Sequence, residues 1–78
     1  MREKQLRLLL TFHTTAAAMA MDRFCARQAV PGRLIPVPRA ITAGCGMCWS
    51  APPEAEAAVL QAAAEAGVEA AGVYQMLV

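Results

Sequence analysis

Residues 34–39 read Leu34-Ile35-Pro36-Val37-Pro38-Arg39, and they constrain the architecture more than any other part of the chain. Their apolar side chains indicate a β-strand over residues 33–39. Pro36 and Pro38 are two residues apart, so their missing N–H groups fall on the same side of that strand. That side cannot join a ladder of hydrogen bonds. The strand is therefore predicted to lie at an edge of its sheet and to pair through its other side only.

The segments on both sides of this strand alternate between strand-like and helix-like apolar periodicity. Further strands are expected over residues 6–12, 47–51 and 68–77, and helices over about 15–28 and 54–66. In the ferredoxin-like arrangement of a βαββαβ chain, the second and fourth strands lie at the edges, which agrees with the two prolines. We therefore predict an α+β, ferredoxin-like fold.

This fold would be a single four-stranded antiparallel sheet with two helices on one face. Its other face is then expected to be bare. A homodimer contact is expected on that face, with contributions from Leu34, Pro36 and Pro38. The core of so small a domain is thin, so a second copy could bury the apolar surface that the core does not.

The chain has 78 residues, so we expect a single domain over residues 1–78, with a flexible start at residues 1–5. A domain of this size buries only about 60% of the surface that its unfolded chain exposes. The net charge of +1 argues against a nucleic-acid partner. No apolar run approaches the ~20 residues of a membrane span, so no membrane association is expected.

The number of cysteines indicates the compartment. There are three, whereas secreted disulfide frameworks more often have an even number. Free thiols in a reducing cytoplasm fit this count better. Residues 1–20 imitate a signal peptide, but His13, Thr14 and Thr15 interrupt the apolar run. We therefore expect a cytoplasmic protein.

The strongest candidate for chemistry is Cys45, which lies in a predicted turn between Gly44 and Gly46. Such a turn can present a thiol to solvent and aim backbone N–H groups at it. Arg39 could supply a nearby positive charge that favours the thiolate. The alternative is a hairpin turn in which the glycines serve geometry alone and Cys45 is incidental.

Cys48 completes a Cys-x-x-Cys pattern with Cys45, and three interpretations are open. The pair could form a reversible disulfide, could supply half of a zinc site, or could include Cys48 only as a strand residue. We favour the strand residue, since the motif enters a strand and only Cys25 and His13 remain as further ligands. A copper-carrier interpretation is disfavoured because the loop before the first helix has no cysteine. No metal and no cofactor are expected.

His13 and Thr14 follow the first strand and are weaker candidates. His13 could reach the neighbouring hairpin, although a lone histidine at a strand end is more often structural or solvated. Thr14 or Thr15 is expected to cap the first helix through its hydroxyl.

The chain resembles the selenium/sulfur carrier protein-like family of small bacterial and archaeal domains. The resemblance extends from about residue 8 to residue 74, and the segments that carry it are residues 10–15 (LTFHTT), 34–39 (LIPVPR), 41–46 (ITAGCG), 67–69 (GVE) and 72–74 (GVY). Two positions depart from the family pattern. Cys48 stands where an aliphatic or small residue is usual, and Thr14 stands where some members carry serine.

The resemblance implies a small carrier of sulfur or selenium rather than a stand-alone enzyme. Cys45 would hold the atom, with Arg39, Gly44, Gly46, Cys48, His13 and Thr14 as binding or supporting residues. The implied partners are a desulfurase-like donor and an acceptor protein. The alternatives are a regulatory or interaction domain that dimerises through its open sheet face, and a Cys-x-x-Cys redox protein.

Overall fold

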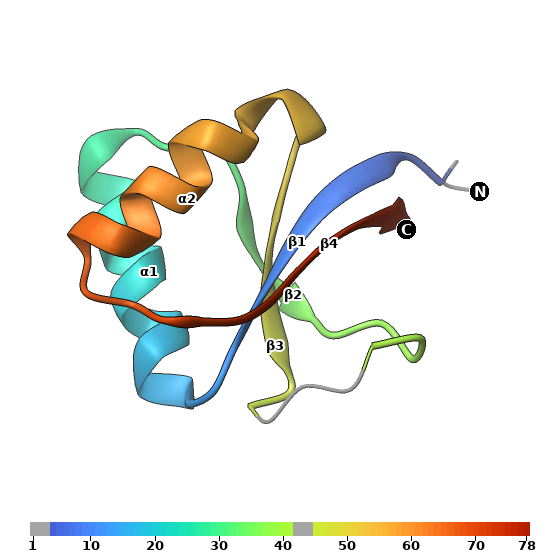
Figure 1. Ribbon diagram of the computed structural model, residues 1–78, viewed down its shortest axis with the longest axis horizontal. Helices are drawn as coiled ribbons and strands as arrows, with labels where there is room; N and C mark the ends of the chain where they lie inside the picture. The colour runs from blue at the N-terminus through green and yellow to red at the C-terminus, as the bar shows by residue number, and fades with distance from the viewer. Residues whose placement is uncertain (1–3, 42–44) are drawn as a thin grey trace.

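The computed structural model describes residues 4–41 and 45–78. Its elements, in order, are β1 (Leu6–Phe12), α1 (Thr15–Gln28), β2 (Arg33–Pro36), β3 (Met47–Ala51), a short 3₁₀ helix (Pro53–Ala55), α2 (Glu56–Glu65) and β4 (Ala70–Leu77). The strands form one antiparallel sheet in the order β2-β3-β1-β4 (Figure 1). This confirms the predicted ferredoxin-like α+β fold, with β2 and β4 at the edges.

The β2 edge forms as the prolines predict. Among the described residues β2 pairs with β3 alone, from Arg33 opposite Ser50 to Pro36 opposite Met47. The Val37 N–H adds one more bond to this side, donating to the Gly46 carbonyl at 3.0 Å. The strand ends at Pro36 rather than at residue 39, because the chain next closes a turn in which the Ile41 N–H donates to the Pro38 carbonyl at 3.0 Å.

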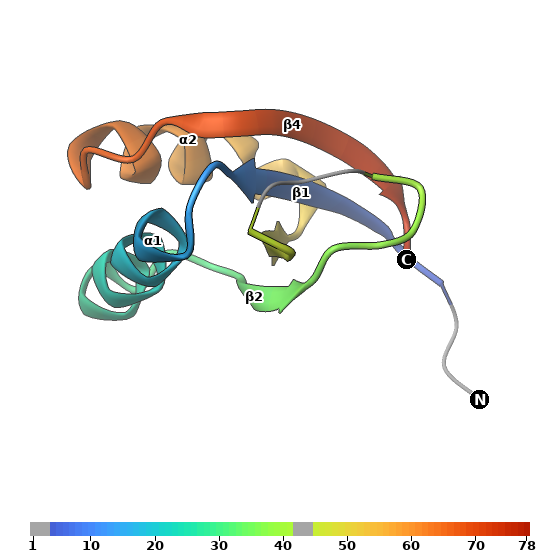
Figure 2. The ribbon, with the colours of Figure 1, turned by 90° about the horizontal axis from the view of Figure 1, so that it is seen from below.

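The main core lies between the sheet and the two helices, which Figure 2 shows on the same side of the sheet. The strands contribute alternate residues to it, including Leu8, Leu10, Phe12 and Trp49. The Trp49 indole N–H donates to the Pro31 carbonyl at 3.1 Å. Gly32 lies directly against this indole at φ +123°, so the turn before β2 has no room for a Cβ.

A second, smaller cluster covers part of the opposite face. Its buried members are Leu9, Cys48 and Ile41, and partly buried side chains around them include Val37 and Met76. We call residues 37–41 the cover segment, because Val37 and Ile41 within it pack against Leu9 and Cys48 on this face. Figure 2 shows the segment running from the end of β2 toward the β4 side of the sheet. The expectation of a bare face is therefore wrong for this part of the sheet. Leu34 also differs from expectation, since it packs against the core on the helix side.

The start of α2 and the start of β4 differ from the sequence expectation, and both differences come from the way that α2 begins and ends. Pro53–Ala55 forms a 3₁₀ turn, and α2 starts only at Glu56. At the other end, the Val68 N–H donates to the Ala63 carbonyl at 2.8 Å, so residue 68 closes the helix instead of opening β4. Within the described residues, no helix is long and apolar enough to cross a membrane.

Candidate functional site: the thiol turn before β3

Cys45 and Gly46 form a tight turn immediately before β3. The Cys45 sulfur accepts a hydrogen bond from the Met47 N–H at 3.4 Å, and its S–H donates to the Met47 carbonyl at 3.3 Å. Gly46 makes this possible because its φ of +79° is a left-handed conformation that other residues rarely adopt. The backbone therefore holds one N–H group against the sulfur, as the glycine-flanked sequence predicts.

Exposure separates the three thiols of the chain, all of which lie in the described residues and are free of disulfides. Cys25 and Cys48 are 1% and 0% exposed, whereas Cys45 is only partly buried at the margin of the main core. A partner protein can reach Cys45 without unfolding the domain. The same is not true of the other two thiols.

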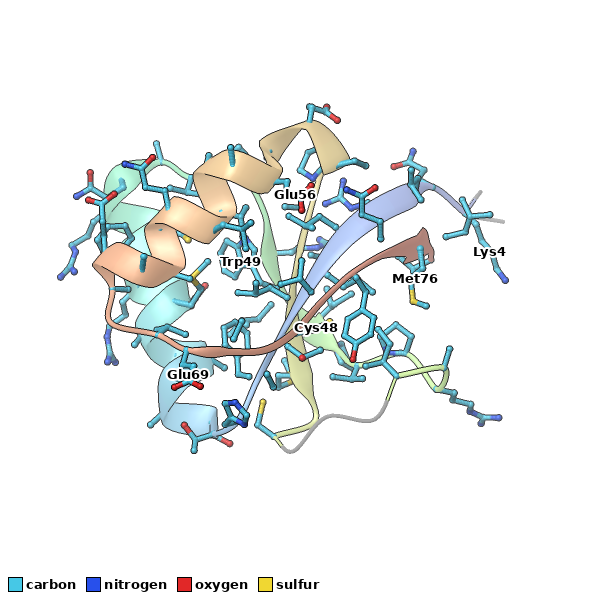
Figure 3. The ribbon with its side chains drawn as sticks, viewed as in Figure 1. Lys4, Cys48, Trp49, Glu56, Glu69 and Met76 are labelled. Atoms are coloured by element: carbon cyan, nitrogen blue, oxygen red, sulfur yellow. The ribbon has the colours of Figure 1, made fainter. Side chains whose placement is uncertain are left out.

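Cys48, labelled in Figure 3, is the second residue of β3. It lies opposite Thr11 of β1 and Ile35 of β2. Burial beneath the cover segment raises the pKa of its thiol, and the neighbouring Cys45 raises it further, to about 11. At neutral pH Cys48 is therefore a protonated thiol. Its position supports the interpretation of Cys48 as a strand residue, although it stays close enough to Cys45 for the two to interact electrostatically.

Cys25 is part of the helix side of the core. It lies on α1, and burial raises the pKa of its thiol, with a smaller contribution from the negative charge of Asp22. It therefore has the character of a small apolar core residue.

The connection between β1 and α1 lies beside the thiol turn. The register that places Thr11 opposite Cys48 brings the following residues to the sheet end where β3 begins, and Figures 1 and 2 both show this proximity. His13 is exposed there. Thr14 is the N-cap of α1, and its hydroxyl accepts from the Ala17 N–H at 3.1 Å, which confirms the expected cap.

Two other candidate residues do not join this group. Arg39 is exposed at the tip of the turn between Pro38 and Ile41, and Figures 1 and 2 show that turn well apart from residues 45–46. Within the described residues, no hydrogen bond links Arg39 to Cys45. Gly44 lies outside the described residues.

The described residues contain no group of three or more His, Cys, Asp or Glu side chains close enough to hold a metal ion. The chemistry available at the turn is that of a single accessible thiol. A contribution that the sequence analysis did not identify is the N-terminal end of α1, whose partial positive charge lies at the same sheet end. The Thr14 cap was the available signal, but only the strand register shows that the helix starts at the end of the sheet where β3 begins.

One comparison with known proteins gives a match, to a protein family. No curated protein and no solved structure matches the chain. Residues 7–75 match the family described as "Putative Se/S carrier protein-like", which covers nearly the whole chain and both the thiol turn and the capped start of α1. The chain therefore belongs to the Se/S carrier protein-like family.

Proposed function

We propose that this protein carries a sulfur or selenium atom on Cys45, receiving it from a donor protein and passing it to an acceptor. One observation carries the proposal: of the three thiols, Cys45 alone combines partial exposure with a backbone N–H aimed at its sulfur. Membership of a family named for selenium and sulfur carriage supports the same conclusion.

The proposed loading step is a transfer between two thiols. The Cys45 thiolate attacks the outer atom of a persulfide on the donor, a new S–S bond forms at Cys45, and the donor cysteine leaves as a thiolate. Unloading reverses these roles, since the acceptor thiolate attacks the outer atom and Cys45 leaves. Neither step needs an oxidant or a reductant, because one S–S bond is exchanged for another. With selenium, the outer atom is selenium and the bonds are otherwise the same.

The surroundings of Cys45 suit an anionic persulfide. The Met47 N–H already donates to the sulfur at 3.4 Å. The N-terminal end of α1 adds a favourable partial charge from the same end of the sheet. These two groups take the supporting role that the sequence analysis gave to Arg39.

The burial of Cys48 protects the load. A Cys48 thiolate could attack the inner sulfur of the Cys45 persulfide, forming a Cys45–Cys48 disulfide and releasing hydrosulfide. Burial keeps Cys48 protonated, with a pKa of about 11, so this discharge is suppressed at neutral pH. We infer that the Cys-x-x-Cys pattern here serves carriage and not disulfide exchange.

The test is intact mass spectrometry after incubation with a cysteine desulfurase and cysteine, before and after reductant. The wild type should gain the mass of one sulfur atom, reversibly, and should pass it to an acceptor thiol. Cys48→Ala and Cys25→Ala should load equally, whereas Cys45→Ser should not. A parallel incubation with selenocysteine compares selenium with sulfur.

Two results would contradict the proposal. Equal loading of all variants would mean that sulfur is deposited without selectivity, and an interaction domain would then be the better account. Loss of loading or release in Cys48→Ala alone would mean that the two cysteines act as a redox pair.

A further inference from the structure

A hollow lies on the sheet face opposite the helices, beside the cover segment, with a volume of about 750 Å³. This volume falls within the range of about 300–1,000 Å³ that is typical of small-molecule sites. Two arginines line it, Arg7 from β1 and Arg33 from β2, with Ser50 of β3 between them. We call this site the arginine hollow.

Arg7 and Ser50 form a prearranged pair of donors. The Arg7 Nε–H donates to the Ser50 hydroxyl oxygen at 3.1 Å, which fixes the plane of the guanidinium. The two terminal nitrogens of Arg7 are not used in that bond, and neither is the hydroxyl proton of Ser50. Ser50 is only 4% exposed, so its hydroxyl forms the floor of the hollow rather than part of a solvated surface.

Arg33 completes the set from the opposite side, since its Cα lies directly across from that of Ser50 in the β2–β3 register. Among the described residues, the lining of the hollow includes no acidic side chain. Its remaining wall is largely apolar and comes from Ile35, Pro36 and Val78. The positive charges of Arg7 and Arg33 attract an anion, and an apolar wall favours an organic group attached to it.

We propose that the arginine hollow binds a small organic oxyanion, with its phosphate, sulfate or carboxylate group held by Arg7, Arg33 and Ser50 and its organic part against the apolar wall. The site is separate from the thiol turn. Ser50 lies near the end of β3, whereas Cys45 precedes the start of that strand. The proposal therefore goes beyond carriage and does not depend on it, and Cys45→Ser should bind the same ligands as the wild type.

The test uses phenyl phosphate and inorganic phosphate as probes, at constant ionic strength, followed by the backbone amide NMR signals of the full chain. Phenyl phosphate should bind saturably and more tightly than inorganic phosphate, while uncharged benzyl alcohol should not bind. The shifts should centre on Arg33 and Ser50. Because a charge-assisted hydrogen bond contributes enough for about a tenfold change in affinity, Arg7→Gln and Arg33→Gln should each weaken phenyl phosphate binding about tenfold.

Arg23→Gln is the matched control, because Arg23 is an exposed arginine on α1 and changes the net charge by the same amount. Arg7→Gln also removes the hydrogen bond to the buried Ser50 hydroxyl and could therefore weaken binding by disturbing the fold. Arg33→Gln tests the loss of charge without removing that bond. Equal weakening in Arg23→Gln would show a nonspecific charge effect and overturn the proposal. Binding of a hexaglutamate peptide without binding of either phosphate would also overturn it, in favour of a surface for acidic protein segments.

Discussion

The turn at Cys45 and the strand at Cys48 are three residues apart, yet they give the same side chain opposite properties. At Cys45 the backbone bends through a left-handed glycine and leaves the thiol partly exposed, at the end of the sheet where α1 starts. At Cys48 the regular alternation of β3 points the thiol into a closed apolar cluster under the cover segment. The difference teaches that a Cys-x-x-Cys spacing alone does not make two thiols equivalent; the backbone between them decides which one can react.

The largest expected difference between the two regions is chemical reactivity. At pH 7 a thiol with a pKa of about 11 is ionised in only about one molecule in ten thousand. Limiting iodoacetamide at pH 7 should therefore label Cys45 long before Cys48 or Cys25. Peptide mapping by mass spectrometry reads the order directly. In about 8 M urea, which unfolds the chain, all three thiols should label at similar rates. Native labelling that begins at Cys48 would remove the contrast.

The pH dependence of stability should also differ between the regions. The pKa of Cys48 is about 11 in the folded chain, against 9.0 for a free thiol. Between these values the unfolded chain binds fewer protons than the folded chain, so stability is fully present below about pH 9 and falls as the pH rises toward 11. The loss attributable to Cys48 should be about 3 kcal/mol.

Urea unfolding at a series of pH values measures this loss. Cys48→Ala supplies the reference, because it removes the titrating group and leaves the lysine, the arginines and the tyrosine in place. An identical alkaline slope in wild type and Cys48→Ala would mean that Cys48 does not carry the effect.

Replacing each thiol by a hydroxyl should sharpen the contrast further. Cys48→Ser places a polar group in the cluster of Leu9 and Ile41 and should lower the free energy of unfolding by about 1–3 kcal/mol. Cys45→Ser keeps a group that can use the Met47 backbone, at a partly exposed site, and should change it by less than about 0.5 kcal/mol. Denaturant melts of the two variants decide the comparison, and equal losses would contradict it.

A smaller loss of stability than that of Cys48→Ser is expected at Gly46. A Cβ there would meet no other atom within 4 Å, so Gly46→Ala should cost only the strain of a left-handed alanine, about 1 kcal/mol. Its consequence for the thiol should be clearer than its effect on stability, because any relaxation of φ moves the Met47 N–H away from the sulfur. Slower loading of Cys45 with a nearly unchanged melting curve would be the expected pair of results.

The sequence predicted the features that depend on local chemistry. Pro36 and Pro38 place β2 at an edge because a missing N–H acts wherever the strand lies, and the Thr14 cap depends only on the next three residues. The limits of β3 were also correct, since Met47–Ala51 is short and bounded by Gly46 and Pro52.

The features that it missed depend on long-range packing. Ile41 covers the sheet because the chain after β2 folds back, which a strand pattern does not reveal. Leu34 faces the helices because its register with Trp49 fixes its side of the sheet. The Arg7–Ser50 bond joins residues 43 apart in sequence, so neither residue attracted notice. Arg39 was expected beside Cys45 from sequence proximity, but an intervening turn carries it away.

The paired prolines of β2 have a consequence for self-association. Strands from other copies can extend a sheet wherever an edge offers free backbone groups, and repeated extension at both edges leads to fibres. Here Pro36, and Pro38 just after β2, remove two of the donors on the outer side of this edge, while β4 has eight residues with neither a proline nor a charged side chain. Extension through the β4 edge joins two copies and then stops, because each copy ends in its blocked edge. The Pro-x-Pro spacing that places β2 at an edge of the sheet would thus also stop the growth of the sheet after two copies.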